Sequence, residues 1–220
     1  MRSANTISLV ERESDMSLKM VVFYGSVRSQ RQGIKAARFV TNKCRERGHE
    51  AALIDPLEFP LPLLDKMYKE YAPGTAPPLL QRLADLVIPA DAYVVVSGEY
   101  NHSVPPALAN LLDHFLEEYF RKPSAIVSYS AGSFGGVRAA VVLRSMLAEM
   151  GMSSIPSTLP IPTVQSAFDD ADNPTNPRFP ARADRFFEEL EWYATALRDA
   201  RGRACARSES DTAELVLKKS

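Results

Sequence analysis

The strongest structural signal in this sequence is an apolar run that ends in two small residues, Leu18-Lys19-Met20-Val21-Val22-Phe23-Tyr24-Gly25-Ser26. A run with almost no polar alternation is typical of a strand that is buried on both faces of a sheet. A helical pattern follows from about residue 32 to residue 47, and Gly48 is expected to end it as a C-terminal cap. A buried strand followed at once by a helix indicates an α/β protein.

Strands and helices continue to alternate along the rest of the chain. Further strands are expected at residues 51–54, 92–96, 124–128 and 153–159, and further helices at residues 79–88, from 106 onward, at 137–150 and at 181–200. Residues 56–78 are rich in proline and have no sustained helical period, so we expect an irregular excursion over the surface. This order predicts a doubly wound, five-stranded parallel sheet with helices on both faces.

Length and composition indicate one globular domain. The chain has 220 residues, of which 45% are apolar and 24% are charged, which is enough for one hydrophobic core. We expect this domain at residues 18–200. Residues 1–17 are polar and aperiodic and are expected to form a flexible N-terminal extension, and the charged residues 201–220 a flexible C-terminal tail.

The charge balance and the rare residue types exclude several classes of function. A net charge of -1 and a pI near 6.3 lack the basic surplus of a nucleic-acid-binding protein. Two cysteines cannot form a disulfide framework or a zinc site. No apolar run approaches the ~18 residues that a membrane span needs, and the first residues lack the apolar core of a signal peptide. We therefore expect a cytoplasmic protein with neither a nucleic-acid nor a membrane partner.

The loop after the first strand, residues 25–33, has the donors that a phosphate needs. Ligands of open parallel sheets bind beyond the carboxyl ends of the strands. The loop contains Ser26, Arg28 and Arg31, and the backbone N–H groups of a helix start lie next to them. It is neither a Walker A motif nor a dinucleotide fingerprint. The alternative interpretation is a surface turn with two solvated arginines.

Two more strand ends carry unusual residues. Glu99, Tyr100 and Asn101 follow the third strand, where a polar stretch can offer backbone donors and acceptors to a flat heterocycle. Residues 128–136 follow the fourth strand, and their glycines let the backbone approach a ligand closely. The alternatives are an ordinary strand-to-helix loop and a glycine-rich helix entry.

The loop after the fourth strand also has to be compared with a hydrolase motif. Ser128-x-Ser130-x-Gly132 nearly spells the Gly-x-Ser-x-Gly nucleophile elbow of α/β-hydrolases. In those enzymes the catalytic histidine follows the serine in the chain, whereas all three histidines of this chain precede Ser130. The sequence therefore disfavours a hydrolase.

Together, the three loops resemble the NADPH-dependent FMN reductase family of flavodoxin-like proteins, which includes small quinone, azo and chromate reductases. The matching motifs are Gly25-Ser26-Val27-Arg28-x-x-Arg31, Glu99-Tyr100-Asn101 with Val104-Pro105, and Ser128-Tyr129 with Gly135-Gly136. Asn110 and Asp113 fall where the family also has Asn and Asp. Gly98 stands where the family usually has proline, and Phe134 makes the third loop less glycine-rich than usual.

The resemblance implies a flavodoxin-like fold and an FMN site. Three sets of residues would form that site: Ser26, Arg28 and Arg31 at the phosphate, Glu99, Tyr100 and Asn101 along the isoalloxazine ring, and Ser130, Gly132 and Ser133 at the other edge of the ring. The second set would act largely through backbone groups.

The resemblance also implies an activity. Such an oxidoreductase passes hydride from NADPH or NADH to bound FMN and on to a small-molecule acceptor: a quinone, flavin, azo compound or metal oxyanion. The cofactor performs the chemistry, so no side chain is expected as a catalytic acid or base. The family implies a homodimer or homotetramer. Two alternatives stay open: a flavodoxin-like electron carrier, which the net charge of -1 disfavours, and a flavin-binding regulatory protein.

Overall fold

The computed structural model describes the backbone of residues 17–217 and the side chains of residues 17–204, so the predicted N-terminal extension, apart from Ser17, lies outside the described residues. The strands are β1 (Lys19–Tyr24), β2 (Glu50–Ile54), β3 (Ala92–Gly98), β4 (Pro123–Tyr129) and β5 (Ser153–Ile161). The α-helices are α2 (Gly33–Glu46), α3 (Pro78–Val87), α4 (Pro106–Asp113), α5 (Val137–Glu149) and α6 (Phe179–Leu217). Short 3-10 helices are η1 (Tyr68–Glu70), η2 (Glu117–Tyr119) and η3 (Val164–Ser166).

The five strands form one parallel sheet in the order β2-β1-β3-β4-β5. The chain first steps from β1 to β2 and then crosses back over β1 to β3, so the direction of winding reverses between β1 and β3. This order is that of flavodoxin-like sheets, in which the reversal marks the ligand crevice. The predicted fold class is confirmed.

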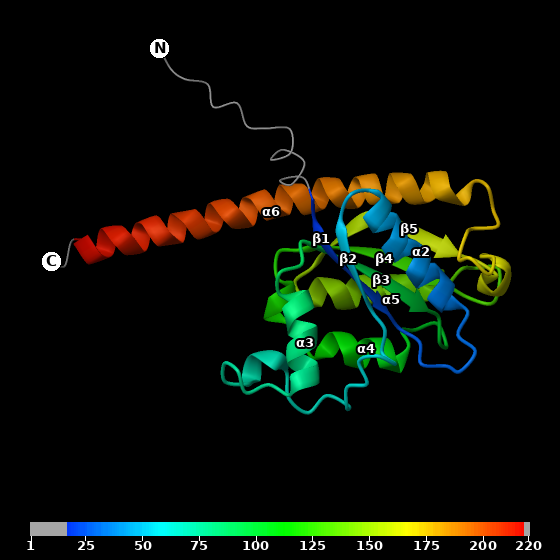
Figure 1. The fold of residues 1–220 in the computed structure, drawn as a ribbon, viewed down its shortest axis with the longest axis horizontal. Coiled ribbons are helices and arrows are strands. Elements are labelled where there is room, and N and C mark those ends of the chain that lie inside the picture. The colour runs from blue at the N-terminus through cyan, green and yellow to red at the C-terminus, as the bar shows by residue number, and fades with distance from the viewer. Residues whose placement is uncertain (1–16, 218–220) are drawn as a thin grey trace, which may run out of the picture.

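Two hydrophobic cores lie on opposite faces of the sheet. Met20 and Val22 of β1 pack into the core under α2 and α6, whereas Val21 and Phe23 pack into the core under α3, α4 and α5. Figure 1 shows these helices on the two sides of the sheet. The alternation explains why β1 has no polar face: both of its faces are covered.

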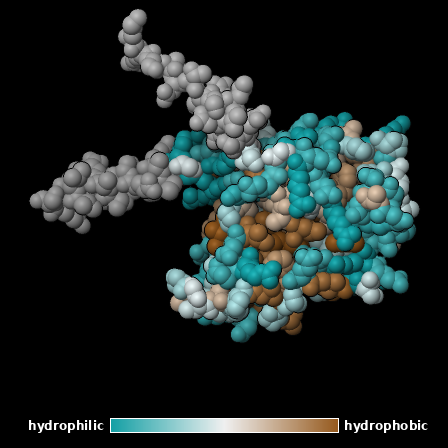
Figure 2. All heavy atoms as spheres, viewed as in Figure 1, coloured by the Kyte–Doolittle hydropathy of each residue, from teal (hydrophilic) through white to brown (hydrophobic). Residues whose placement is uncertain are grey.

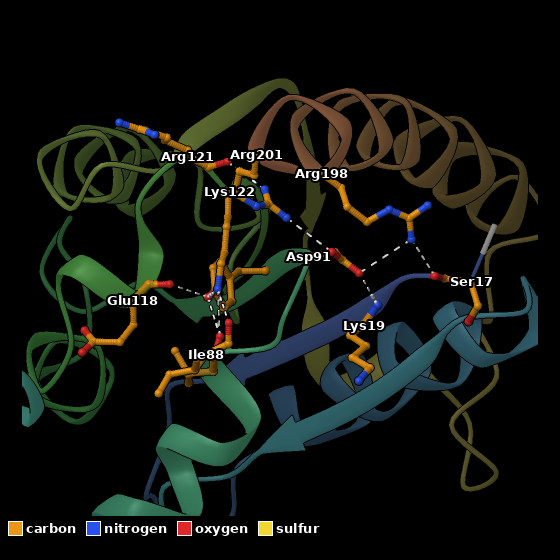
Figure 3. A network of polar contacts seen from close by, with 11 residues as sticks. Ser17, Lys19, Ile88, Asp91, Glu118, Arg121, Lys122, Arg198 and Arg201 are labelled. Carbon is orange, nitrogen blue, oxygen red and sulfur yellow. Dashed lines mark hydrogen bonds and ion pairs between the residues drawn. The ribbon is translucent and has the colours of Figure 1, made fainter. Parts of the chain in front are cut away.

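The last helix, α6, is longer than the sequence analysis predicted. Its predicted end at residue 200 is wrong, because the helix continues to Leu217 and its last turns extend away from the sheet (Figure 1). Gly202 does not end it, since one glycine costs a helix only about 1 kcal/mol. Arg201, placed in the predicted tail, donates a hydrogen bond of 2.8 Å to the carbonyl of Arg121 and pairs with Asp91 at 3.3 Å (Figure 3).

The proline-rich excursion between β2 and α3 has only η1 as regular structure, as predicted. Asn110 of α4 holds it: the Asn110 side chain accepts from the Leu64 N–H at 2.9 Å and donates to the Pro62 carbonyl at 2.8 Å. The face seen in Figure 2 is mostly hydrophilic, with apolar residues gathered around the edge strand β2. Among the described residues, no helix is both long and apolar enough to cross a membrane.

Candidate functional site

A cleft of about 420 Å³ lies beyond the carboxyl ends of β1, β3 and β4, where the winding of the sheet reverses. Its volume falls in the range of small-molecule sites, roughly 300–1,000 Å³. The cleft is lined by Ser26, Arg28, Gln30, Arg31, Gln32, Gly33, Gly98, Glu99, Tyr100, Tyr129, Ser130, Ala131, Val164 and Gln165.

The cleft brings together six of the nine predicted site residues: Ser26, Arg28, Arg31, Glu99, Tyr100 and Ser130. Asn101, Gly132 and Ser133 do not line it, and their contact with a ligand stays a prediction. Asn101 lies in a tight turn with a φ of 51°, and Tyr100 and Ser103 exchange two backbone hydrogen bonds across that turn. The turn therefore fixes the backbone of Tyr100 at the edge of the cleft.

A larger hollow of about 790 Å³ lies at the opposite end of the sheet, around Arg47, His49 and Glu191. Its charged groups bind one another: Glu191 accepts from Arg47 Nε at 2.6 Å and lies 2.9 Å from His49 Nε2. Size alone therefore does not identify the ligand site. The smaller cleft is the better candidate, because it lies where this topology binds ligands.

The first helix after β1 leaves its N-terminal donors available. Within the described part of the chain, no side chain caps α2 at Gln32, and the first turn of α2 contains no acidic residue. The first N–H groups of a helix have no intrahelical partner and carry a partial positive charge. The Ser26 hydroxyl, next to them, accepts from the Arg28 N–H at 3.4 Å. This end of the cleft is therefore suited to an anion.

Arg31 is held by a carboxylate that the sequence analysis did not select. Its two terminal nitrogens donate to the two oxygens of buried Asp55, at 2.5 and 2.6 Å, and Nη1 also donates to the Ser26 carbonyl at 3.0 Å. The hydrogen bonds that Arg31 donates to Asp55 raise the pKa of Arg31. Arg31 thus braces the loop against the end of β2, and its charge is largely balanced by Asp55.

Tyr129, the last residue of β4, forms the wall between the first and third loops. A Cβ atom at Gly33 would lie 2.2 Å from Cζ of Tyr129, so the ring fits only because position 33 is glycine. The Tyr129 hydroxyl lies 3.5 Å from that of Tyr24. Burial raises the pKa of both tyrosines, so their hydroxyls keep their protons at neutral pH. The sequence analysis quoted Tyr129 in a motif but did not select it as a site residue.

Glu99 uses its carboxylate inside the protein. Its Oε2 accepts from the N–H groups of Arg138 and Ala139 at 3.1 and 3.3 Å, which caps the start of α5. The Arg138 guanidinium lies 3.5 Å from Oε1 of Glu99 and 4.5 Å from the ring centre of Phe134. Because its charge is balanced there, Glu99 can line the cleft without repelling an anion.

The third loop uses its carbonyl groups in bonds to the segment around η3. The carbonyls of Ser130 and Gly132 accept from the N–H groups of Val164 and Thr163, each at 3.0 Å. The carbonyl of Ala131 accepts from Nε2 of Gln165 at 3.2 Å. In the part of the chain that the structure describes, the N–H groups of residues 131–133 have no hydrogen-bond partner. The loop therefore offers donors to a ligand.

The hydrolase alternative finds no support in the geometry. Ser130 Oγ donates to the Gly132 carbonyl at 3.0 Å. His49 lies against Glu191 at the other end of the sheet, and His114 binds the Asn110 carbonyl at 2.7 Å. Among the described residues, no histidine lines the cleft, and no group of His, Cys, Asp and Glu side chains could hold a metal ion.

Comparison with solved structures supports the fold. A flavoenzyme NAD(P)H:(acceptor) oxidoreductase from Paracoccus denitrificans superimposes with a TM-score of 0.64 at 22% identity, over 80% of this chain and 98% of the other. An NADH:FMN oxidoreductase in its apo form superimposes with a TM-score of 0.57 at 16% identity, over 80% and 89% of the two chains.

Comparison of sequences identifies the family. Residues 18–166 match the family model described as NADPH-dependent FMN reductase. A quinone reductase of Pseudomonas putida is 31% identical over 179 residues, which are 76% of this chain and 91% of the relative. An NAD(P)H-dependent FMN reductase of Nectria sp is 30% identical over 155 residues, 66% and 75% of the two chains. The predicted family and enzyme class are confirmed. The chain belongs to the NADPH-dependent FMN reductase family.

Proposed function

We propose that this NAD(P)H-dependent reductase keeps FMN bound in the cleft as a resident cofactor and delivers electrons to quinone-type acceptors. One observation carries the proposal: the cleft lies at the reversal point of the sheet and is rich in hydrogen-bond donors, while Glu99, the one carboxylate among its described lining residues, is already paired with Arg138. Such a site favours a ligand with an anionic end and a ring with several acceptors.

The first loop fits the phosphate of FMN. The N–H groups at the start of α2, the Ser26 hydroxyl and the Arg28 side chain converge there. Asp55 balances Arg31, and within the described residues no acidic partner is found for Arg28, so its charge is available to a phosphate. We assign phosphate binding to Ser26 and Arg28, and to Arg31 mainly the positioning of the loop.

The second and third loops fit a flat ring with carbonyl oxygens. Tyr100 and Glu99 lie at one side of the cleft, and Ala131 lies at the other, followed in the chain by the unpaired N–H groups of Gly132 and Ser133. When bound, FMN supplies the chemistry of hydride acceptance and release. The N–H groups of the third loop stabilise negative charge on the ring without any side-chain acid or base.

The oligomeric state and the cellular location are further parts of the proposal. Phe134 of the third loop and Val137 and Val141 of α5 expose apolar side chains (62%, 39% and 72%). Exposed apolar side chains next to a site favour a partner surface, and we assign them to a second copy of this chain, in a homodimer or homotetramer.

Cys44 is a buried free thiol, and we place the protein in the reducing cytoplasm.

A titration with NADPH under argon tests the proposal. The purified protein is expected to be yellow, to release FMN and not FAD on denaturation, and to lose its absorbance near the flavin maximum when NADPH is added. Addition of a quinone should restore the colour. A protein that holds FMN but is not bleached would be an electron carrier or a regulatory protein. A protein that turns FMN over without retaining it would use FMN as a substrate.

A further inference from the structure

The third loop has unpaired N–H groups at residues 131–133, of which Ala131 lines the cleft, so a ligand edge that fits this loop has to present acceptors. The isoalloxazine ring has such an edge, with two carbonyl oxygens, but an imide N–H lies between them. This N–H needs an acceptor of its own, because an unpaired polar group out of water is costly. The carbonyls of Ser130, Ala131 and Gly132 are already engaged by the segment around η3.

The second loop does not supply that acceptor through its nearest carbonyls. The Gly98 carbonyl accepts from Ser97 Oγ at 2.9 Å, and the Tyr100 carbonyl accepts from the Ser103 N–H at 2.8 Å. The carboxylate of Glu99 is bound to the start of α5. An acceptor on another wall of the cleft would leave all of these bonds intact.

Gln165 of η3 has the required group. Its side chain lines the cleft, and its Nε2 donates to the Ala131 carbonyl at 3.2 Å. This bond sets the orientation of the amide, because only the nitrogen end can donate. The Oε1 atom has no hydrogen-bond partner among the described residues, and it lies on the same side chain that holds the donor loop.

The backbone next to Gln165 is held in an uncommon conformation. Thr163 has a φ of 45° and a ψ of 52°, in the left-handed region that β-branched residues rarely adopt. In this conformation the N–H groups of Thr163 and Val164 both reach the third loop. Strained backbone concentrates at ligand-binding segments, where the surrounding contacts hold it in place.

We propose that Gln165 recognises the imide N–H of the flavin through Oε1, and so completes a donor–acceptor–donor edge together with the N–H groups of the third loop. The inference rests on the proposed function, since it requires FMN in the cleft. Gln165 is then a specificity-determining residue: it selects an isoalloxazine ring that carries a proton on the imide nitrogen.

The test compares FMN with FMN methylated on the imide nitrogen, using apoprotein and fluorescence titration. The wild type should bind FMN about tenfold more tightly than the methylated analogue, as expected for one neutral hydrogen bond. Gln165→Leu should bind the two ligands about equally. Gln165→Glu keeps an acceptor at the same place, so it should bind both ligands more weakly but still prefer FMN.

Gln30→Leu serves as the matched control, since Gln30 lines the same cleft from the first loop. It should leave the ratio of the two dissociation constants unchanged. A preference for FMN that survives in Gln165→Leu, or a wild type without any preference, would overturn the role of Gln165. A wild type that binds no FMN at all would overturn the proposed function as well, so the two failures are distinguishable.

Discussion

The two ends of the sheet treat their polar groups in opposite ways. At the amino ends of the strands, the Asp91 carboxylate accepts from the Lys19 N–H at 3.0 Å and pairs with Arg201 at 3.3 Å (Figure 3). Arg198 of α6 donates to the carbonyl of Ser17 at 2.9 Å in the same network. The polar groups at this end thus fasten α6 to β1 and to the start of β3.

A buried lysine completes that network. Lys122 Nζ donates to the carbonyls of Val87 and Ile88 at 3.2 and 2.7 Å and to the Tyr93 hydroxyl at 3.1 Å. At the carboxyl ends, by contrast, the Arg28 side chain and the N–H groups of residues 131–133 have no such partners in the described chain. The comparison teaches that the functional end is recognised by the polar groups that the fold leaves available.

The largest expected effect comes from breaking the network at the amino ends. Lys122→Met should lower the free energy of unfolding by about 3 kcal/mol, because buried carbonyls lose their donor. The FMN dissociation constant should change less than twofold. Urea denaturation and flavin titration measure the two quantities. Lys19→Met is the matched control: its side chain is exposed, so less than about 0.5 kcal/mol should be lost. A stable Lys122→Met variant would contradict the interpretation.

The second effect, at the cleft, should have the reverse pattern: a large change in FMN binding and little change in stability. Arg28→Ala removes a charge-assisted hydrogen bond to phosphate, worth about 1.5–3 kcal/mol, so the FMN dissociation constant should rise tenfold to hundredfold. The melting temperature of the apoprotein should not change, because no hydrogen bond or ion pair of the Arg28 side chain is found within the described chain. Arg38→Ala, on the exposed side of α2, should leave FMN binding intact. Unchanged affinity in Arg28→Ala would make Arg28 a mere surface charge.

The third effect is a pH dependence at the end opposite the cleft. Burial opposes ionisation of Glu191, but hydrogen bonds from Arg47 and His49 lower its pKa from 4.5 to about 2. A carboxyl whose folded pKa is lowered stabilises the protein above pH 4.5, and this stabilisation is lost as the pH falls to about 2. After allowance for solvent screening, we expect a loss of about 1–2 kcal/mol. Denaturation at several acidic pH values should show a shallower slope for Glu191→Gln, and equal slopes would refute this assignment.

The smallest effect is expected at Ser130. Its hydroxyl donates to the Gly132 carbonyl at 3.0 Å, so Ser130→Ala should weaken FMN binding and quinone reduction at most tenfold, as for one neutral hydrogen bond of about 0.5–1.5 kcal/mol. Both reductase and esterase activity should be assayed. Esterase activity in the wild type that disappears in the variant would restore the hydrolase alternative.

The sequence predicted those parts of the molecule that depend on local pattern. Apolar runs such as the one at β1 predicted the strands, and the ends of these strands marked the loops that form the cleft. Arg31 was correctly placed in the cleft, but its partner was missed. Asp55 directly follows a different strand, and only the pairing of β1 with β2 brings the two side chains together.

Other features depend on contacts that no local pattern encodes. Gln165 follows β5 without any motif, and its position is set by bonds to the third loop, which comes much earlier in the chain. The end of α6 was misplaced because the charged residues from 201 onward were interpreted as a tail. Arg201, the residue before Gly202, bonds to Asp91 and to the Arg121 carbonyl. These tertiary contacts outweigh the weak helix propensity of Gly202.

The contact between Gly33 and Tyr129 has an evolutionary consequence. Gly33 begins α2 and Tyr129 ends β4, yet any side chain at position 33 would occupy the space of the tyrosine ring. Neither position can therefore drift alone: a lineage that keeps the tyrosine has to keep the glycine, whereas one that replaces the tyrosine with a small residue releases position 33 from constraint. The two positions should vary together among descendants of this gene, as one heritable unit.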